Sequence, residues 1–172
     1  AVCDILFGDV VPSGKTVMTF PRRTGHIPLY YNVTSSGNFV NGYYGEELFP
    51  CYLDSVTSPA YPFGYGLSYT TFAYGPVTAE ETCLSLGELE AGKRFRIAVT
   101  VENTGSFDGK EVVQLYIHDK IASRMRPLRE LKAFQKPLIR CGEAAEIQFE
   151  LGWADLGFYT EQGEYLVEPG SF

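Results

Sequence analysis

The chain has 172 residues, of which 45% are hydrophobic and 20% charged, a composition typical of a globular protein with a core and not of a disordered chain. Its formal net charge of −7 argues against nucleic-acid binding, because phosphate recognition needs clustered Lys and Arg. No apolar run approaches the length that spans a membrane, so we expect neither nucleic acid nor a membrane as a partner.

The first residues predict the end of a helix. Residues 1–7 form a short apolar run that stops at Gly8, which has the position of a glycine cap. The start carries neither an initiator Met nor the basic region of a signal peptide. We therefore interpret the chain as a piece of a longer protein.

The stretch that follows predicts little regular structure. Residues 16–20 read as a strand stopped by Pro21, and residues 27–31 read as another short extended piece. Residues 32–60 form a long segment rich in Ser, Gly, Asn and Tyr, and loops of this length are usually functional or held by a partner. We expect residues 1–67 to need more chain, because they are too irregular to build a core alone.

Residues 61–72 hold five aromatic side chains, two glycines and one proline. Such rings need apolar surroundings, and Gly and Pro between them fix the backbone. The segment predicts a tight crossover that cements two packed bodies, with a strand from Ser68 onward. In the alternative interpretation, its tyrosines and those of the preceding loop stack on sugar rings: Tyr30, Tyr31, Tyr43, Tyr44, Tyr61, Tyr65 and Tyr69.

The second part, residues 68–172, alternates apolar and polar residues with period two. Residues 95–102 show the pattern most clearly, and residues 112–118 read as their partner strand. Further short strands are expected at residues 131–139, 145–151, 157–159 and 165–167. This spacing predicts a mainly-β fold, an antiparallel β-sandwich of immunoglobulin-like type.

The four cysteines, Cys3, Cys51, Cys83 and Cys141, lie far apart and form no close pair, so we expect no structural zinc. Four cysteines allow three disulfide connectivities, and the sequence does not choose among them. We interpret them as four separate, mostly buried thiols.

The acidic residues do not form a catalytic pair. Residues 46–47 and 80–81 are adjacent glutamates, whose side chains diverge in a strand or a helix, and we interpret them as solvated surface charge. Asp4 and Asp9 flank a helix end and a turn, where Asp is a routine local acceptor.

The two histidines and the basic cluster complete the candidates. His26 and His118 are expected in a turn and at a strand end, and no nucleophile motif accompanies them. Arg126, held before Pro127, is interpreted as a bridge to a carboxylate of an adjoining domain, with a solvated loop as the alternative. We thus predict no catalytic residue, no metal ligand and no cofactor in this chain, and we assign no substrate-binding residue.

Several runs together resemble the C-terminal portion of family 3 glycoside hydrolases, the β-glucosidase and β-xylosidase group. The run at residues 61–69 is the strongest match, and the runs follow one another in the family's order. The runs are residues 4–9, 12–15, 19–22, 28–32, 61–69, 101–105, 109–116, 126–127, 130–132 and 168–170.

The resemblance implies an enzyme with a (β/α) barrel, an α/β sandwich domain and a fibronectin type III-like domain. Residues 1–67 would be the C-terminal remnant of the α/β domain, and residues 68–172 the fibronectin-like sandwich, with its last strand truncated and an open edge left behind. The nucleophilic Asp and the acid/base Glu that a retaining glycosidase needs would both lie upstream.

The expected function is therefore that of the structural section of a retaining β-glycosidase acting on terminal β-linked glucose or xylose. This section would be inactive alone, with the missing barrel and α/β domains as its partners and with homo-oligomerisation left open. The alternatives are a stand-alone carbohydrate-binding β-sandwich module and an adhesion or scaffolding sandwich. The compartment, cytoplasmic or secreted, and the preferred sugar are not readable from the sequence.

Overall fold

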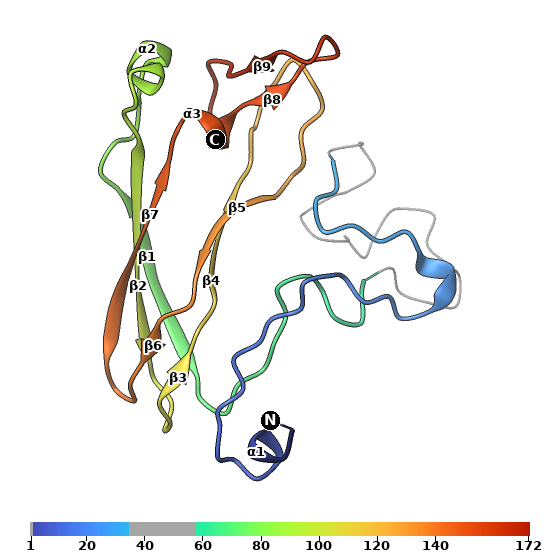
Figure 1. Ribbon diagram of the computed structural model, residues 1–172, viewed down its shortest axis with the longest axis vertical. Helices are drawn as coiled ribbons and strands as arrows, with labels where there is room; N and C mark the ends of the chain where they lie inside the picture. The colour runs from blue at the N-terminus through green and yellow to red at the C-terminus, as the bar shows by residue number, and fades with distance from the viewer. Residues whose placement is uncertain (1, 35–57) are drawn as a thin grey trace.

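The computed structural model describes residues 2–34 and 58–172, which form a two-layer β-sandwich and an N-terminal arm (Figure 1). The arm consists of residues 2–34 and 58–71. Its segments 16–20 and 61–65 lie side by side, and its residues Val33 and Thr34 bond to Leu128 and Pro127 of the sandwich. No helix in these described residues is long and apolar enough to cross a membrane.

The first layer is a three-stranded antiparallel sheet in the order β1-β2-β7: β1 (Phe72–Ala79), β2 (Phe95–Asn103) and β7 (Ala144–Leu151). The alternation read from the sequence is confirmed for β2 and β7, which pair from Phe95↔Leu151 to Glu102↔Ala144. Their inward side chains, such as Val101 and Ile147, are 0% and 3% exposed and carry the core.

The second layer faces β2 and β7 and is built from β4 (Val113–Ile117) and β5 (Glu130–Gln135). Its inward residues Val113 and Leu115 pack against Val99 and Val101 of β2. Two short antiparallel pairs flank this layer: β3 (Gly109–Lys110) with β6 (Leu138–Ile139), and β8 (Phe158–Tyr159) with β9 (Tyr165–Leu166). The mainly-β sandwich expected from the sequence is thus confirmed.

Two predicted features of the sandwich are wrong. β4 does not pair with β2, because the chain crosses to the opposite layer after Asn103 and β4 pairs with β5. The single strand expected over residues 131–139 is divided into β5 and β6. Pro137 lies in the break, and proline has no N–H to donate to a ladder. A period-two pattern indicates which face is apolar but not which layer a strand joins.

The helices are short. α1 (Val2–Leu6) ends two residues before Gly8, which has φ of +83° and whose N–H donates to Ile5 O, so the predicted helix end and its glycine are confirmed. No pattern in the sequence predicts α2 (Leu86–Glu90) or α3 (Trp153–Leu156), because neither helix is long enough to show a helical period. α2 begins with a capping box in which Ser85 and Glu88 satisfy each other's backbone N–H groups.

The arm is more irregular than predicted. No strand forms over residues 16–20, so that prediction is wrong. Only the ends of this stretch bond to the other segment of the arm: Thr16 N–H donates to Tyr65 O (2.8 Å) and Phe20 N–H to Tyr61 O (2.8 Å). Between them the ladder is interrupted at Pro62, which lacks an N–H. No strand forms at the described residues 27–31, which follow the 3₁₀ helix η1 (Thr24–His26). The strand expected from Ser68 onward is β1, which begins at Phe72.

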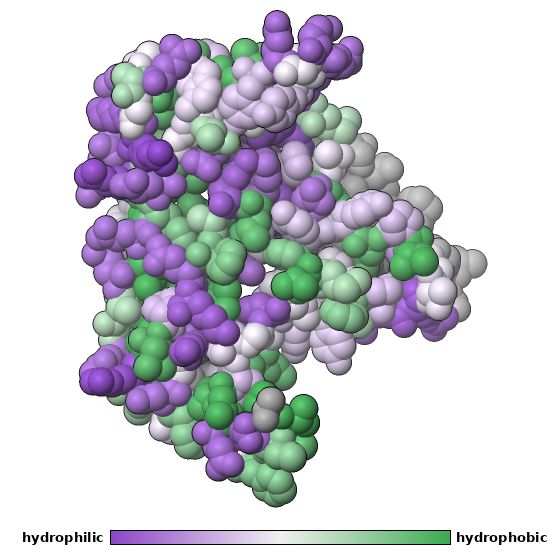
Figure 2. Space-filling model, viewed as in Figure 1, coloured by the Kyte–Doolittle hydropathy of each residue, from purple (hydrophilic) through white to green (hydrophobic). Residues whose placement is uncertain are grey.

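The surface of the arm is unusually apolar. Figure 2 shows hydrophobic residues gathered at the lower end of the molecule, over α1. The exposed side chains include Val2, Leu6, Phe7, Val17 and Leu67, each more than 70% exposed. Such a contiguous apolar surface marks an interaction site.

The side chain of Asn103 ties the sandwich together at the end of β2. It is 0% exposed, and its Nδ2 donates to Phe107 O (2.8 Å) and Ile139 O (2.9 Å). Its Oδ1 accepts from the Thr70 hydroxyl (2.6 Å) and from Gly105 N–H (3.1 Å). One amide therefore joins the entry to β1, the turn after β2, and β6 in the facing layer.

We expect Asn103→Ala to lower the free energy of unfolding by roughly 3 kcal/mol, because several buried polar groups lose their partner at once. Urea unfolding followed by tryptophan fluorescence measures the change. Thr104→Ala is the matched control, because Thr104 is exposed and its hydroxyl contacts only Thr71 among the bonds described. A loss below about 1 kcal/mol is expected there, and equal losses for the two variants would contradict the central role of Asn103.

Candidate functional site

The arm and the sandwich meet in an ion pair between Lys15 and Glu111. Lys15 Nζ lies 3.3 Å from Glu111 Oε1, and the two side chains are only 18% and 10% exposed. Lys15 also donates to Gly66 O (3.1 Å) in the second segment of the arm, and the Tyr74 hydroxyl of β1 donates to Glu111 Oε1 (3.0 Å). We call these four residues the clamp, since they join both segments of the arm to the sandwich.

Tyr74 is held as a hydrogen-bond donor in the clamp. Burial raises the pKa of its phenol well above the ordinary value, and the neighbouring charge of Glu111 and the hydrogen bond to it raise the pKa further. The phenol therefore stays protonated at all pH values at which proteins are ordinarily handled. Glu111 consequently accepts from one cation and one neutral donor.

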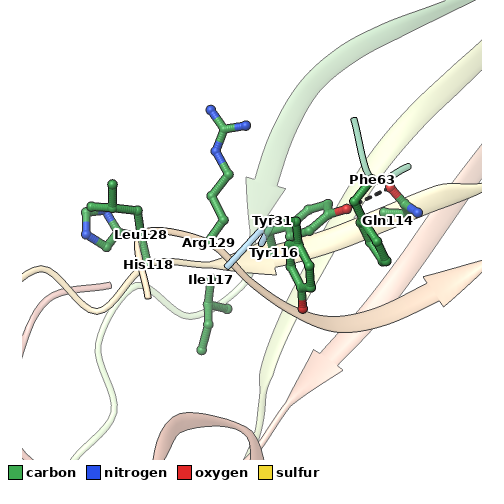
Figure 3. Close-up of a pocket in the computed structure, with 8 residues that line it drawn as sticks. All are labelled: Tyr31, Phe63, Gln114, Tyr116, Ile117, His118, Leu128 and Arg129. Carbon is green, nitrogen blue, oxygen red and sulfur yellow. Dashed lines mark hydrogen bonds between the residues drawn. The ribbon is translucent and has the colours of Figure 1, made fainter. Parts of the chain in front are cut away.

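A pocket of about 530 Å³ lies between the arm and β4 (Figure 3). The rings of Tyr31 and Phe63, both from the arm, stack with centroids 4.2 Å apart and an interplanar angle of 18°. Tyr116 of β4 meets Tyr31 edge-on at 6.3 Å and donates its hydroxyl to Gln114 Oε1 (2.9 Å). The pocket is lined by Tyr31, Phe63, Gln114, Tyr116, Ile117, His118, Leu128 and Arg129.

Gly64 sets how closely the arm approaches β4. Its φ is +79°, and a Cβ at this position would lie 2.5 Å from Gln114 Oε1. Its N–H also donates to Thr16 O (2.8 Å), which holds the two arm segments together. The positive φ favours glycine here, and an added Cβ would also displace the flexible end of the Gln114 side chain.

The chemistry of this junction is that of packing and binding. The rings of Tyr31, Phe63 and Tyr116 group on one side of the pocket, and His118 lies on the other (Figure 3). No carboxylate is among the described residues that line it, and a pair of acids is what glycosidic bond cleavage needs. No group of three or more His, Cys, Asp or Glu suited to a metal ion occurs in residues 2–34 and 58–172.

The prediction that the paired glutamates are surface charge holds for Glu80 but not for Glu81. Glu80 is exposed and contacts Arg96 at 3.4 Å, as expected of a solvated charge. Glu81 is half-buried, and its Oε2 is shielded from solvent, so the interpretation as surface charge fails for this side chain. Residues 46–47 lie outside the described residues, as do Tyr43 and Tyr44.

The predicted positions of the two histidines are confirmed. His26 lies in η1, a turn of the arm, and His118 is exposed directly after β4. The described residues that line the pocket with His118 include Tyr116 and Arg129 but no Ser or Cys.

The interdomain role expected for Arg126 is wrong. Its side chain is 7% exposed, and its guanidinium contacts Glu130 Oε2 (3.0 Å), Leu156 O (3.5 Å) and the ring of Phe158 (5.1 Å). Lys132 binds the second oxygen of Glu130 at 2.5 Å. All these partners belong to the sandwich, where Arg126 fastens β8 to the start of β5.

The thiols are separate but not buried. Cys3, Cys83 and Cys141 are free, as predicted, and all three are exposed, so the expectation of burial is wrong for them. Each lies outside the two clusters of the core, in α1 or in a connecting segment. Cys51 lies outside the described residues.

The aromatic crossover packs only in part. Phe63 stacks against Tyr31, whereas Tyr61 and Tyr65 remain 52% and 37% exposed. The Tyr69 hydroxyl donates to Ile5 O of α1 (2.8 Å), which ties the crossover to the start of the chain. The expected burial of every ring is therefore not found in the described residues.

Comparisons with known proteins relate the whole chain to one enzyme group. The model of the glycosyl hydrolase family 3 C-terminal domain matches residues 1–69, and that of the fibronectin type III-like domain matches residues 111–172. The chain is 40% identical to a periplasmic β-glucosidase of Salmonella typhimurium and 38% identical to a β-xylosidase of Formosa agariphila. Both alignments cover 100% of this chain and 22% of the relative.

Solved structures agree with this relation. A β-glucosidase from Erythrobacter marinus superposes with a TM-score of 0.85 at 46% identity, covering 98% of this chain and 20% of that one. A β-glucosidase from Listeria innocua in complex with glucose gives a TM-score of 0.85 at 40% identity, covering 98% and 23%. The chain therefore spans less than a quarter of the length of the relatives it matches.

A double-mutant cycle with Lys15→Met and Glu111→Gln should give a coupling free energy of about 1–3 kcal/mol, because the pair is largely buried and joins distant parts of the chain. Urea unfolding of the four proteins measures it. The control cycle uses Lys93→Met and Glu88→Gln, a pair 47% and 48% exposed at the same 3.3 Å. Its coupling should be clearly smaller, because solvent screens an exposed ion pair, and equal couplings would contradict a special role for the clamp.

Gly64→Ala should lower the free energy of unfolding by about 2 kcal/mol, from the positive φ and from the contact with Gln114 together. Gly142→Ala isolates the first cause, since Gly142 has φ of +73° with nothing within 4 Å of an added Cβ. It should cost about 1 kcal/mol. Adding Gln114→Ala to Gly64→Ala should restore part of the difference, and no restoration would contradict the close approach.

Proposed function

The chain belongs to glycoside hydrolase family 3, and from this membership we propose that it is the C-terminal structural section of a retaining β-glycosidase that hydrolyses terminal β-linked glucose or xylose residues. This proposal depends on one observation. In relatives called β-glucosidase and β-xylosidase, a segment of 22% of the relative's length aligns with the whole of this chain. In this proposal residues 1–67 complete an α/β domain and residues 68–172 form the fibronectin type III-like domain.

The carboxylates of the chain support a role without bond cleavage. A retaining glycosidase needs two carboxyl groups about 5–5.5 Å apart, with room for the sugar between them. Glu111, the least exposed carboxylate of the described residues, is held by Lys15, and Glu130 is held between Arg126 and Lys132. Both charges are neutralised by neighbouring cations inside the protein, which fits a function in holding the structure together.

The apolar surface of the arm supports the proposed partners. Val2, Phe7 and Val17 are 72%, 83% and 85% exposed, and water contact with so many large side chains is unfavourable. In the proposed enzyme the preceding barrel and α/β domains cover this surface. The clamp then fixes the sandwich to the part of the α/β domain that the arm supplies.

The arrangement of the exposed tyrosines disfavours the alternative of a stand-alone sugar-binding module. A platform for sugar rings needs aromatic faces that lie in one plane. The rings of Tyr61 and Tyr65 are tilted by 42° at 5.3 Å, and Phe20 meets Tyr61 at 78°. These rings pack against each other at angles and do not make a flat surface.

The 172-residue chain alone should not hydrolyse 4-nitrophenyl β-glucoside or β-xyloside, whereas a longer family 3 enzyme containing it should. Release of nitrophenolate measures turnover, and isothermal titration with glucose, cellobiose and xylobiose tests binding by the chain alone. Turnover by the short chain would contradict the proposal that the catalytic acids lie elsewhere. Tight sugar binding by it would favour the module, and an inactive longer enzyme would refute the assigned activity.

A further inference from the structure

Strand β1 lies at one edge of the three-stranded sheet. Among the described residues it forms a ladder only with β2, so N–H and C=O groups along its other edge have no strand partner. Many proteins protect such an edge by keeping the strand very short, but β1 has eight residues. The outer edge of β1 is therefore a place where another strand could add to the sheet.

β1 also lacks the charged residues that commonly protect an edge strand. Its sequence, FAYGPVTA, contains no Lys, Arg, Asp or Glu, and its Tyr74 and Val77 are 51% and 70% exposed. An exposed, uncharged edge of this kind is a template for pairing with another chain. A second copy of the same chain is the best-matched partner, because two identical strands related by a two-fold axis form a self-complementary antiparallel pair.

A β-bulge interrupts this edge at the centre of the strand. The register of β1 on β2 shifts between Tyr74 and Val77. Gly75 and Pro76 lie together opposite Thr100, two residues against one, which is the pattern of a β-bulge. Pro76 has no N–H to donate to any neighbouring strand, and a bulge bends and twists the strand that contains it. β1 consequently does not present one straight, continuous edge.

The core does not require this bulge. A Cβ on Gly75 would lie 3.4 Å from Thr100 O and 3.6 Å from Thr100 Cβ, both ordinary contacts. Tyr74 and Val77 both pair with buried valines of β2, although side chains on one face of a regular strand are two positions apart, not three. Removing one of the two bulge residues would therefore make the ladder regular without turning either side chain to the other face.

We infer that the bulge at residues 75–76 keeps β1 from pairing with the β1 of a second copy of this chain. It divides the strand into two ladders of three residues, 72–74 and 77–79. Segments of this length are at the lower limit of strands and form too few backbone bonds to hold two chains together. This role is independent of the proposed function, because it concerns only the edge of the sandwich.

The test deletes Pro76 and introduces Gly75→Thr, which gives β1 a regular register and a strand-forming residue. Sedimentation velocity over a concentration series should give a dimerisation constant at least about tenfold above that of the unchanged chain. Amide exchange of β1 should slow at least about tenfold as the protein concentration rises, because its outer N–H groups gain partners. Adding Val77→Lys should return both measurements to the values of the unchanged chain, since a charge on an edge strand disfavours pairing.

Val77→Lys in the unchanged chain is the matched control. It should move the thermal midpoint by no more than about 1 °C, because this side chain is 70% exposed, and should leave dimerisation unchanged. The double substitution Gly75→Thr with Pro76→Thr keeps the chain length and restores the missing N–H. It should raise the dimerisation constant by a smaller factor, and it decides the question alone if the deletion variant does not fold.

A dimerisation constant that stays unchanged in both altered chains would overturn the inference. Stronger dimerisation without slower exchange of β1, or dimerisation that Val77→Lys does not reverse, would place the contact elsewhere, such as on the apolar arm. Either result would also overturn it.

Discussion

The hydrogen bonds of the buried Asn103 side chain are the constraint on which the layout of the sandwich depends. They fix Thr70, Gly105 and Ile139 around the end of β2, where three parts of the chain change direction. Because Thr70 lies between the aromatic crossover and β1, the same amide also fixes where the arm leaves the sandwich.

The clamp and Gly64 act at the two sides of the junction. The ion pair of Lys15 and Glu111 holds the arm through a strong, directional contact, and Gly64 lets the backbone come close enough for Phe63 and Tyr31 to pack beside β4. A largely buried ion pair is sensitive to the position of both partners. The junction thus fixes the arm to the sandwich through contacts that tolerate little displacement.

Local sequence patterns predict the individual strands well, but they do not predict which parts of the chain contact one another. β2 and β7 were readable because their apolar residues alternate over eight or nine positions, whereas α2 and α3 span only four or five residues. The sequence gives no local signal for the clamp, since Lys15 and Glu111 are 96 residues apart (111 − 15). The pairing of Arg126 with Glu130 has no local signal either, because a spacing of four brings side chains together on a helix and no helix covers these residues.

The long separation within the clamp has a consequence for biosynthesis. Ribosomes add about 5–20 residues per second, so Lys15 waits roughly 5–20 seconds after it is made before Glu111 exists. During that interval the ion pair cannot hold the apolar surface of α1 and the arm against the sandwich. Nascent chains of this kind are candidates for chaperone binding until translation passes the residue that anchors them.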